Sequence, residues 1–541
     1  MRTIHPWRAA LGAACAALTL AATATAVDAG VAPAASRTTG TQIVNIDGGA
    51  VHGAAAPGGY AFRGLPYAAA PTGQLRWRAP QPPASWKGVR EAADFGPSCP
   101  QPRPEQGNVF FPPGPIDEDC LYLNVSTPTL RPDARRPVLV WIHGGGLTQD
   151  ASRNYDGTKL AADGTVVVTM NYRLGALGFL AHPALASRPG GPAGNYGLMD
   201  QRAALRWVQR NISRFGGDPY NVTIAGQSAG GLSVLAHLVS RGSRGLFQRA
   251  IVQSGAFALT QQPLATAKAA GEAFADLAGC PDQTAACLRS RSVDDLVNNF
   301  PGAAIPGVVD GAVLEESIGT ALAGGRFARV PILNGTNHDE ERLFLAIGLA
   351  VSGGSFALVP EAVTADNYQR LIGAVVGASP ERSAAIAAEY PLSAYPSPGV
   401  AFSTLVSDAN FVCPAVQLDR WTSARVPTFA YEFNDDTAPQ VFAPPGWVAA
   451  VATHSSELQY LFDLPNAPFA VPLNADQAAL AAAMRAAWAS FAADGNPSTR
   501  DVRWPALDPR QGERVLSLAS PRPQVDTGFA ARHHCSFWAA A

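Results

Sequence analysis

One strand–turn–helix segment constrains this chain more than any other part of its sequence. The β-branched run at residues 222–225 is followed by Gly-Gln-Ser-Ala-Gly at residues 226–230, and then by small residues and leucines. A strand that turns this sharply into a helix lifts the hydroxyl of Ser228 clear of the sheet, and a Cβ at either glycine would crowd the turn. The pentapeptide alone is weak evidence, because any turn rich in glycine and serine can produce it.

A second predicted strand ends in glycines. Residues 138–142 (Val-Leu-Val-Trp-Ile) run into His143 and then into Gly144–Gly146. Backbone N–H groups of glycines after a strand can face an oxygen that becomes negatively charged in a transition state. The alternatives are a simple loop for the triplet and a surface turn for the pentapeptide. Because both segments follow predicted strands, together they favour an acyl-transfer site of the esterase type.

The rest of the chain predicts an α/β fold. Apolar strands alternate with amphipathic helices, which is typical of a mostly parallel, doubly wound sheet with helices on both faces. Residues 343–422 are expected to form a helical insertion that could serve as a cap. The expected strands are 138–142, 166–172, 222–225, 250–253, 330–333 and 428–433, and the expected helices include 200–212 and one that ends near Gly495.

The composition suits one large domain. Hydrophobic residues make up 47% of the 541 residues and charged residues only 15%, which supplies a large core. The formal net charge of −2 gives no electrostatic reason to expect a nucleic acid or an anionic membrane as a partner. No stretch resembles a linker, so we expect a single domain over residues 27–541, and we expect a monomer.

The N-terminus predicts export from the cell. Arg2 and Arg8 precede the apolar stretch Ala9–Ala22, and Ala24–Ala26 matches an A-x-A cleavage site. We therefore expect residues 1–26 to be a signal peptide and the mature protein to be secreted, with an unusual soluble helix as the alternative. No other run is expected to be long and apolar enough to cross a bilayer, so we expect no stable membrane insertion.

Six of the cysteines lie beyond the predicted signal peptide, and an even number in a secreted chain predicts disulfides. Six cysteines allow fifteen sets of pairs. A metal site at these cysteines is disfavoured, because the chain has no Cys-x-x-Cys. Pairing of nearest neighbours favours Cys99–Cys120 and Cys280–Cys287, and leaves Cys413–Cys535.

Two later segments offer partners for Ser228, which needs a general base and an acid to orient that base. In α/β-hydrolases the chain order is serine, acid, histidine. A predicted strand is followed by the acidic cluster Asp339–Glu341, and His454 lies much later, in a loop after the expected final strand. Both candidates thus follow strands, where this fold presents catalytic groups. A solvated acidic cluster and an ordinary loop histidine are the alternatives.

These segments resemble the type-B carboxylesterase/lipase family, which includes cholinesterases and bacterial p-nitrobenzyl esterases. Residues 118–125 (Glu-Asp-Cys-Leu-Tyr-Leu-Asn-Val) are similar to one family signature, and residues 215–219 (Phe-Gly-Gly-Asp-Pro) with the serine pentapeptide are similar to the other. The likeness covers nearly the whole mature chain. It implies an α/β-hydrolase fold and a carboxylic-ester hydrolase that requires neither metal nor cofactor.

The resemblance also implies roles for single residues. The family's nucleophile corresponds to Ser228, its base to His454 and its acid to Glu340. The three favoured cysteine pairs coincide with those of secreted members. The family's oxyanion donors correspond to Gly145, Gly146 and Ala229.

Several departures from the family pattern bear on the acid and on the substrate. Glu341 stands where a glycine usually follows the acid, so the choice among Asp339, Glu340 and Glu341 stays open. Gln227 replaces the usual glutamate before the nucleophile, and Leu147 replaces a common aromatic residue after the glycine triplet. Both changes favour an apolar, uncharged pocket.

The loop between Cys99 and Cys120 has no tryptophan, whereas cholinesterases use one there as a cation–π platform. We therefore expect a small-molecule ester of a neutral alcohol, with a short to medium acyl chain, rather than a quaternary ammonium substrate. The alternatives are a lipase that prefers long-chain esters, a serine peptidase, and a catalytically silent binding protein on the same fold.

Overall fold

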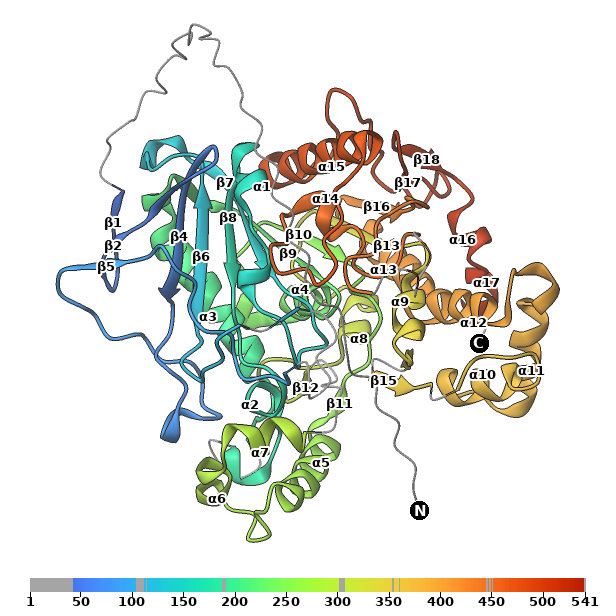
Figure 1. Cartoon of the computed structure of the whole chain (residues 1–541), viewed down its shortest axis with the longest axis horizontal. Helices are drawn as coiled ribbons and strands as arrows, with labels where there is room; N and C mark the ends of the chain where they lie inside the picture. Colours follow the sequence, from blue (N-terminus) through green and yellow to red (C-terminus); the bar gives the residue numbers. More distant parts are fainter. Residues whose placement is uncertain are drawn as a thin grey trace, which may run out of the picture. The chain divides into compact units, whose positions relative to one another are not determined.

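An 11-stranded sheet lies at the centre of the computed structural model (Figure 1). The structure describes residues 42–539 except 104–110, 113, 187–190, 301–306, 353–354, 360, 444–445, 447–448 and 450. In spatial order the strands are β18 (Gln524–Asp526), β17 (Val515–Leu518), β16 (Thr428–Phe433), β13 (Ile332–Asn337), β10 (Arg249–Gln253), β9 (Gly217–Gln227), β7 (Arg136–Ile142), β8 (Val166–Met170), β6 (Tyr122–Thr127), β4 (Gly59–Pro66) and β3 (Ala54–Ala56).

The strand pairings are mostly parallel. Every neighbouring pair from β17 to β8 runs parallel. Antiparallel pairs occur only towards the two edges, at β18 on one side and from β8 through β6 and β4 to β3 on the other. The predicted mostly parallel, doubly wound sheet is therefore confirmed.

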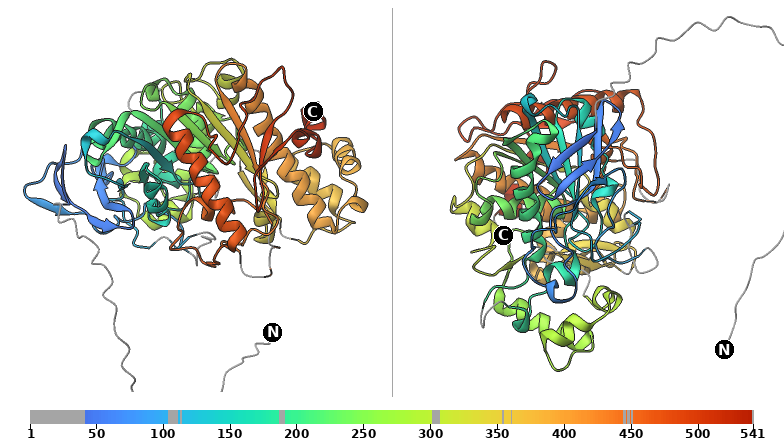
Figure 2. Two further views of the ribbon diagram at one scale, coloured as in Figure 1. Left: turned by 90° about the horizontal axis from the view of Figure 1, so that it is seen from above. Right: turned by 90° about the vertical axis from the view of Figure 1, so that its left-hand side faces the viewer.

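Alternation along β7 explains why both faces of this sheet carry helices. Val138 and Val140 pack in one hydrophobic cluster with side chains of the helices α3 (Tyr196–Asn211) and α4 (Ala229–Val239). Leu139 and Trp141 pack in a second cluster with side chains of α15 (Ala475–Asp494). Successive side chains of a strand point to opposite faces, so a strand covered on both sides is a continuous apolar run. Figure 2 shows the helices on either side of the sheet.

The remaining elements surround this core. A separate three-stranded sheet is formed by β1 (Ile43–Ile46), β2 (Gly49–His52) and β5 (Val89–Glu91). Two strands pair alone, β11 (Gln262–Pro263) and β12 (Val308–Val309). The other helices outside the insertion are α1 (Thr158–Ala162), α2 (Gly175–Phe179), α5 (Leu264–Leu277), α6 (Ala285–Ser290), α7 (Val293–Asn298), α8 (Ile318–Ala323), α14 (Leu458–Leu461), α16 (Phe529–Arg532) and α17 (Cys535–Ala539).

The expected insertion at residues 343–422 is mainly helical. Its own cluster of buried side chains includes Tyr368, Leu371 and Phe402. It also contains a small antiparallel hairpin that the helical expectation missed. Its elements are α9 (Glu340–Ala346), β14 (Leu349–Ser352), β15 (Ser355–Leu358), α10 (Tyr368–Val376), α11 (Pro380–Glu389), α12 (Pro398–Ser407), a π-helical turn (Asp408–Val412) and α13 (Cys413–Ser423).

Two expectations about the chain were wrong. The strand before His454 is β16, but it is not the last strand, because β17 and β18 follow later in the sequence. These strands are only four and three residues long, too short for a pattern of alternation to stand out.

The second wrong expectation was that no run beyond the signal peptide is long and apolar enough to cross a bilayer. Within the described residues, one helical stretch, Pro398–Ser423, is long and apolar enough to cross a membrane by those two measures. In the structure 67% of its 18-residue apolar window is buried against the rest of the protein, as in a core helix.

Three disulfides cross-link the structure, and they join the pairs that nearest-neighbour pairing favoured. The residues from Gln42 onward form one compact unit. The predicted signal peptide, residues 1–26, lies outside the described residues. The disulfides are Cys99–Cys120, Cys280–Cys287 and Cys413–Cys535.

Candidate active site

Ser228 lies on a sharp turn between β9 and α4. Its φ of 56° and ψ of −126° are rare for a residue with a side chain. A Cβ on Gly226 would lie 2.5 Å from the backbone of Gly230, and a Cβ on Gly230 would lie 2.0 Å from the carbonyl oxygen of Ile142. The two glycines therefore permit the close approach of strand and helix that holds Ser228 in this strained conformation.

Two glycines of the loop after β7 line the cavity at Ser228. Gly145 and Gly146 line that cavity and have φ values of +79° and +62°. A Cβ on Gly145 would lie 2.1 Å from the carbonyl oxygen of Gln149, so a side chain does not fit there. Within the described residues neither N–H donates a backbone hydrogen bond. Ala229 is the first residue of α4, where an N–H has no acceptor inside its own helix.

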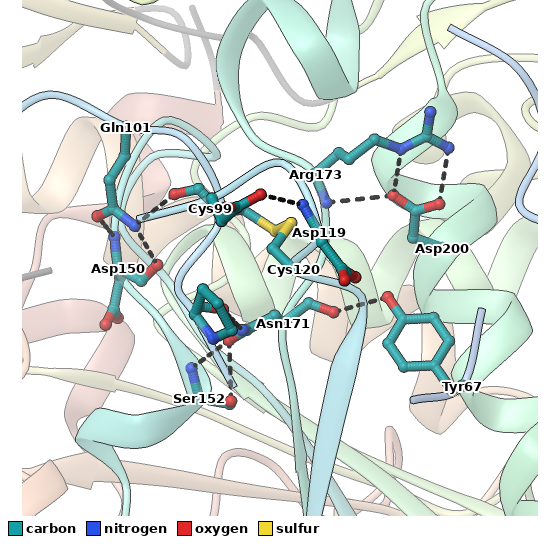
Figure 3. Close-up of a disulfide and its surroundings, with 12 residues drawn as sticks. Tyr67, Cys99, Gln101, Asp119, Cys120, Asp150, Ser152, Asn171, Arg173 and Asp200 are labelled. Carbon is teal, nitrogen blue, oxygen red and sulfur yellow. Dashed lines mark hydrogen bonds and ion pairs between the residues drawn. A yellow bond between two sulfur atoms is a disulfide. The ribbon is translucent and has the colours of Figure 1, made fainter. Parts of the chain in front are cut away.

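A buried polar network supports the segment that follows the glycine loop (Figure 3). The backbone N–H of Asp150 donates to Oε1 of Gln101 at 2.7 Å, and Nε2 of Gln101 donates to the carbonyl oxygen of Asp150 at 3.0 Å. Gln101 is two residues from Cys99, so the first disulfide and the glycine loop are joined through this pair. The hydroxyl of Tyr155 donates to Oδ2 of Asp150 at 2.5 Å. Burial raises the pKa of Asp150.

His454 and Glu340 form a buried pair beside this turn. Nδ1 of His454 lies 2.5 Å from Oε2 of Glu340, and the two side chains are 2% and 0% exposed. The backbone N–H of Asn337 donates to the other carboxylate oxygen, Oε1, at 2.8 Å. Nδ1–H donates to Glu340, and Nε2 is the ring nitrogen left for another partner.

The neighbouring acids have other partners. Oδ1 of Asp339 lies 2.8 Å from Nε of Arg342, and Oδ2 lies 3.2 Å from Nδ1 of His338. The backbone N–H of Glu341 donates to Ser407 at 2.9 Å. Of the three acids that the sequence left open, the geometry brings Glu340 to His454.

Nε2 of His454 has a partner that the sequence did not predict. Nε2 of Gln227 donates to it at 3.1 Å, whereas no hydrogen bond joins it to Oγ of Ser228 within the described part of the chain. Gln227 immediately precedes Ser228, and both side chains line the same cavity. The amide of Gln227 thus holds the imidazole nitrogen that faces the cavity.

Backbone and side-chain bonds join the loop that carries Glu340 to the loop that carries His454. The N–H of Asp339 donates to the carbonyl oxygen of Ala452 at 2.9 Å. Nδ2 of Asn337 donates to the carbonyl oxygen of Thr453 at 2.6 Å and to Oε2 of Glu457 at 2.7 Å. Burial, together with the negative charge of Glu340, raises the pKa of Glu457.

The cavity in front of Ser228 is small, and aromatic side chains form part of its wall. Its volume is about 20 Å³, which is room for about one water molecule. Leu147, which was expected to shape this pocket, does not line it but is buried in the core under the sheet. The described side chains that line the cavity include Phe111, Phe344, Phe442 and Leu458.

The comparisons with known proteins agree with this geometry. The family model described as "Carboxylesterase family" matches residues 40–538. The chain belongs to the carboxylesterase family. The chain is 35% identical to the para-nitrobenzyl esterase of Bacillus subtilis, over 88% of this chain and 94% of that protein. It is 34% identical to human cocaine esterase, over 88% of this chain and 86% of that protein.

A solved structure of PNB esterase superimposes on this carboxylesterase with a TM-score of 0.76 and 31% sequence identity, over 92% of this chain and 99% of that chain. The protein therefore has the α/β-hydrolase fold and is a carboxylic-ester hydrolase. Both expectations from the sequence are confirmed.

Sequence reasoning missed several residues that surround the imidazole of this carboxylesterase. The ring centroids of Phe344 and Phe411 lie 4.8 and 5.2 Å from that of His454. Phe344 is four residues after Glu340, so the helical repeat could have placed it on the same face of α9. Phe411 carried no comparable signal in the sequence.

Two groups of described residues have the side-chain types of a metal site, but in one of them, Cys280, Asp282 and Cys287, the two cysteines form a disulfide. Ligand atoms of His338, Glu432 and His533 lie within 4.8 Å of one another. Nδ1 of His533, however, lies 2.5 Å from Asp408 and Nε2 lies 2.7 Å from Glu432. Burial alone would lower the pKa of His533, but its bonds to the two carboxylates raise it to about 9. Both ring nitrogens therefore donate to carboxylates, and neither is available to a metal.

Proposed function

We propose that this carboxylesterase uses Ser228 as nucleophile, His454 as general base and Glu340 as the acid that orients it, with the N–H groups of Gly145, Gly146 and Ala229 as the oxyanion hole. The observation that carries the proposal is the buried pair of His454 and Glu340 beside the strained turn at Ser228. A nucleophile, a base and an orienting acid supplied by separate elements are the recurrent requirement for acyl transfer.

In the proposed reaction, Ser228 Oγ replaces the amide of Gln227 as the hydrogen-bond donor to Nε2 of His454 when the ester binds. His454 takes the proton while Oγ attacks the carbonyl carbon, and the three N–H groups stabilise the oxyanion. The alcohol leaves with that proton, and a bond between acyl group and serine remains. Water then gives a proton to His454, attacks the acyl carbon and releases the acid with the serine hydroxyl restored.

We propose esters of short to medium acyl chains and neutral alcohols as substrates. The aromatic and aliphatic side chains that line the cavity, Phe111, Phe344, Phe442 and Leu458, support an uncharged acyl group. The amide of Gln227 also keeps a formal negative charge away from His454. Turnover of p-nitrophenyl esters from acetate to palmitate tests this proposal. A rate that increases up to palmitate, or faster turnover of a choline ester than of a neutral butyrate, would contradict it.

The nucleophile is tested first, by hydrolysis of p-nitrophenyl butyrate. We expect Ser228→Ala to lower kcat by about 10⁶-fold, because loss of a catalytic serine removes the covalent route. The matched control is Ser213→Ala, since Ser213 lies on a short helical turn before β9, outside the cavity. Undiminished hydrolysis by Ser228→Ala would rule out the proposed triad. Equal, negligible hydrolysis by the parent protein would favour a silent binding role.

We also propose that the mature protein is secreted. The three disulfides support this, because disulfides form and persist mainly in oxidising compartments. Intact mass of the protein recovered from the culture medium tests both the secretion and the removal of residues 1–26.

A further inference from the structure

A second cavity, of about 470 Å³, lies between α13 and the C-terminal part of the chain. Within the described residues it shares no lining side chain with the cavity at Ser228. One part of its wall is apolar and includes Val416, Leu507 and Val515. It is therefore a separate space, large enough for a small organic molecule.

Carboxyl groups outnumber cations around this cavity. Asp419, Asp508 and Glu513 line it, and Arg420 is the only lysine or arginine among the lining residues that the structure describes. Oε2 of Glu513 accepts a hydrogen bond from the backbone N–H of Ala530 at 2.8 Å. The surroundings therefore favour a cation over an anion.

Asp419 is the buried acid of this group, with an exposed fraction of 7%. Nδ2 of Asn334, on β13, donates to its Oδ1 at 2.9 Å. Its other oxygen, Oδ2, has no hydrogen-bond or ion-pair partner within the described residues. Oδ2 is not among the fully buried side-chain atoms, so it is open to solvent or to a ligand in the cavity. Burial, together with the nearby charge of Glu513, raises the pKa of Asp419.

We propose that this cavity is a binding site for a small organic ammonium ion with an apolar body. The ammonium group donates hydrogen bonds to Oδ2 of Asp419 and to Glu513, and the apolar body lies against Val416, Leu507 and Val515. A ligand of this kind supplies the missing partner of Asp419 and neutralises the excess of carboxyl groups. The site is independent of the ester-hydrolysing cavity.

Isothermal titration calorimetry of the whole mature enzyme with 2-phenylethylammonium tests the proposal. The probes 2-phenylethanol and 3-phenylpropanoate have the same apolar body without the positive charge. Asp419→Asn removes the carboxylate and keeps an oxygen that can accept from Asn334. The matched control is Asp366→Asn, the same change at an exposed position before α10.

We expect one site for the ammonium ion, with a Kd at least tenfold higher in Asp419→Asn and unchanged in Asp366→Asn. We expect the alcohol and the carboxylate to bind at least tenfold more weakly than the ammonium ion. If Asp419→Asn does not fold, Glu513→Gln takes its place with the same expected direction. The Ser228→Ala variant should bind the ammonium ion as the parent enzyme does, so this result does not depend on the proposed triad.

Three outcomes would overturn the proposal. They are equal affinity in the parent enzyme and in Asp419→Asn, tighter binding of the carboxylate than of the ammonium ion, and no saturable binding. Competitive inhibition of p-nitrophenyl butyrate hydrolysis at the measured Kd would also overturn it, because it would place the ion in the cavity at Ser228.

Discussion

Gln227 bonds the one nitrogen of His454 that the proposed reaction needs. Among the residues that the structure describes, the imidazole has the amide at Nε2 and a single carboxylate partner, Glu340. In the proposed reaction, the serine hydroxyl has to take the place of this amide at Nε2 when the substrate binds.

A charge at this position should change the pH dependence of hydrolysis. We expect Gln227→Glu to move the acid limb of the kcat/KM profile to higher pH by about one unit, because a carboxylate beside an imidazole favours the imidazolium. Gln227→Met removes the amide without adding charge, and its acid limb should stay in place. An unchanged limb in Gln227→Glu would show that residue 227 does not contact His454 in the working enzyme.

The acid can be identified by a matched set of substitutions. We expect Glu340→Gln to lower kcat by about 10³- to 10⁴-fold, because the imidazole loses the carboxylate that fixes its tautomer and stabilises its charged form. Asp339→Asn should lower kcat by less than tenfold, since Asp339 bonds Arg342 instead. Steady-state kinetics with p-nitrophenyl butyrate distinguishes the two. The reverse order of effects would transfer the role to Asp339.

The disulfides differ greatly in the number of residues that separate their two cysteines in the sequence. Cys413 is 122 residues from Cys535, whereas Cys280 is only 7 residues from Cys287. In the chain-entropy model, the free energy of unfolding gained from a cross-link rises with the length of the loop that it closes. The Cys413–Cys535 disulfide joins α13 to α17 and so fastens the C-terminal segment to the helical insertion.

Removal of each bond should therefore have a different effect. We expect Cys413→Ser with Cys535→Ser to lower the free energy of unfolding by about 5 kcal/mol, and the corresponding change at Cys280 and Cys287 to lower it by about 2 kcal/mol. Guanidinium unfolding followed by tryptophan fluorescence measures both. Equal losses would mean that native-state strain, rather than loop closure, determines the contribution.

The secondary-structure elements that could be predicted from the sequence are those with long apolar patterns. The strands around Val138 and Val222 are buried on both faces, and their continuous apolar runs made them visible. The short strands β17 and β18 and the hairpin in the insertion were not predicted, because three or four residues cannot show a period. Similarly, the glycines and Ser228 were found from a local pattern, but the partner of Nε2 depends on two loops that meet only in the folded protein.

For the molecule as a whole, a buried charge network near the C-terminus makes stability depend on pH. His533 is held between Asp408 and Glu432, and Arg532 also bonds Glu432, at 2.8 Å. His338 packs against the ring of His533, with centroids 5.2 Å apart. Because the pKa of His533 is raised to about 9, the folded state binds its proton more tightly than the unfolded state does.

The sign of the effect follows from that difference. The contribution of His533 is fully present below about pH 6.5, the ordinary pKa of histidine, and is lost as the pH rises towards 9. We expect the free energy of unfolding to fall by about 3 kcal/mol across this range, from urea titrations at several pH values. His533→Gln should flatten the dependence, whereas His52→Gln, at an exposed position, should not. A parent protein equally stable at pH 6.5 and 9 would contradict this prediction.

Two groups of positions near the cavity differ in their use for directed evolution. One is the junction between the loops of Glu340 and His454, and the other is the aromatic part of the cavity wall. Substitutions at this junction should displace the proposed base and acid together, so we expect active clones to carry them rarely, whatever ester is selected for. Phe111 and Phe442 line the cavity outside the junction, and their rings contact each other. Libraries of variants at Phe111 and Phe442 can therefore change which acyl group is accepted, while the residues of the proposed triad stay unchanged.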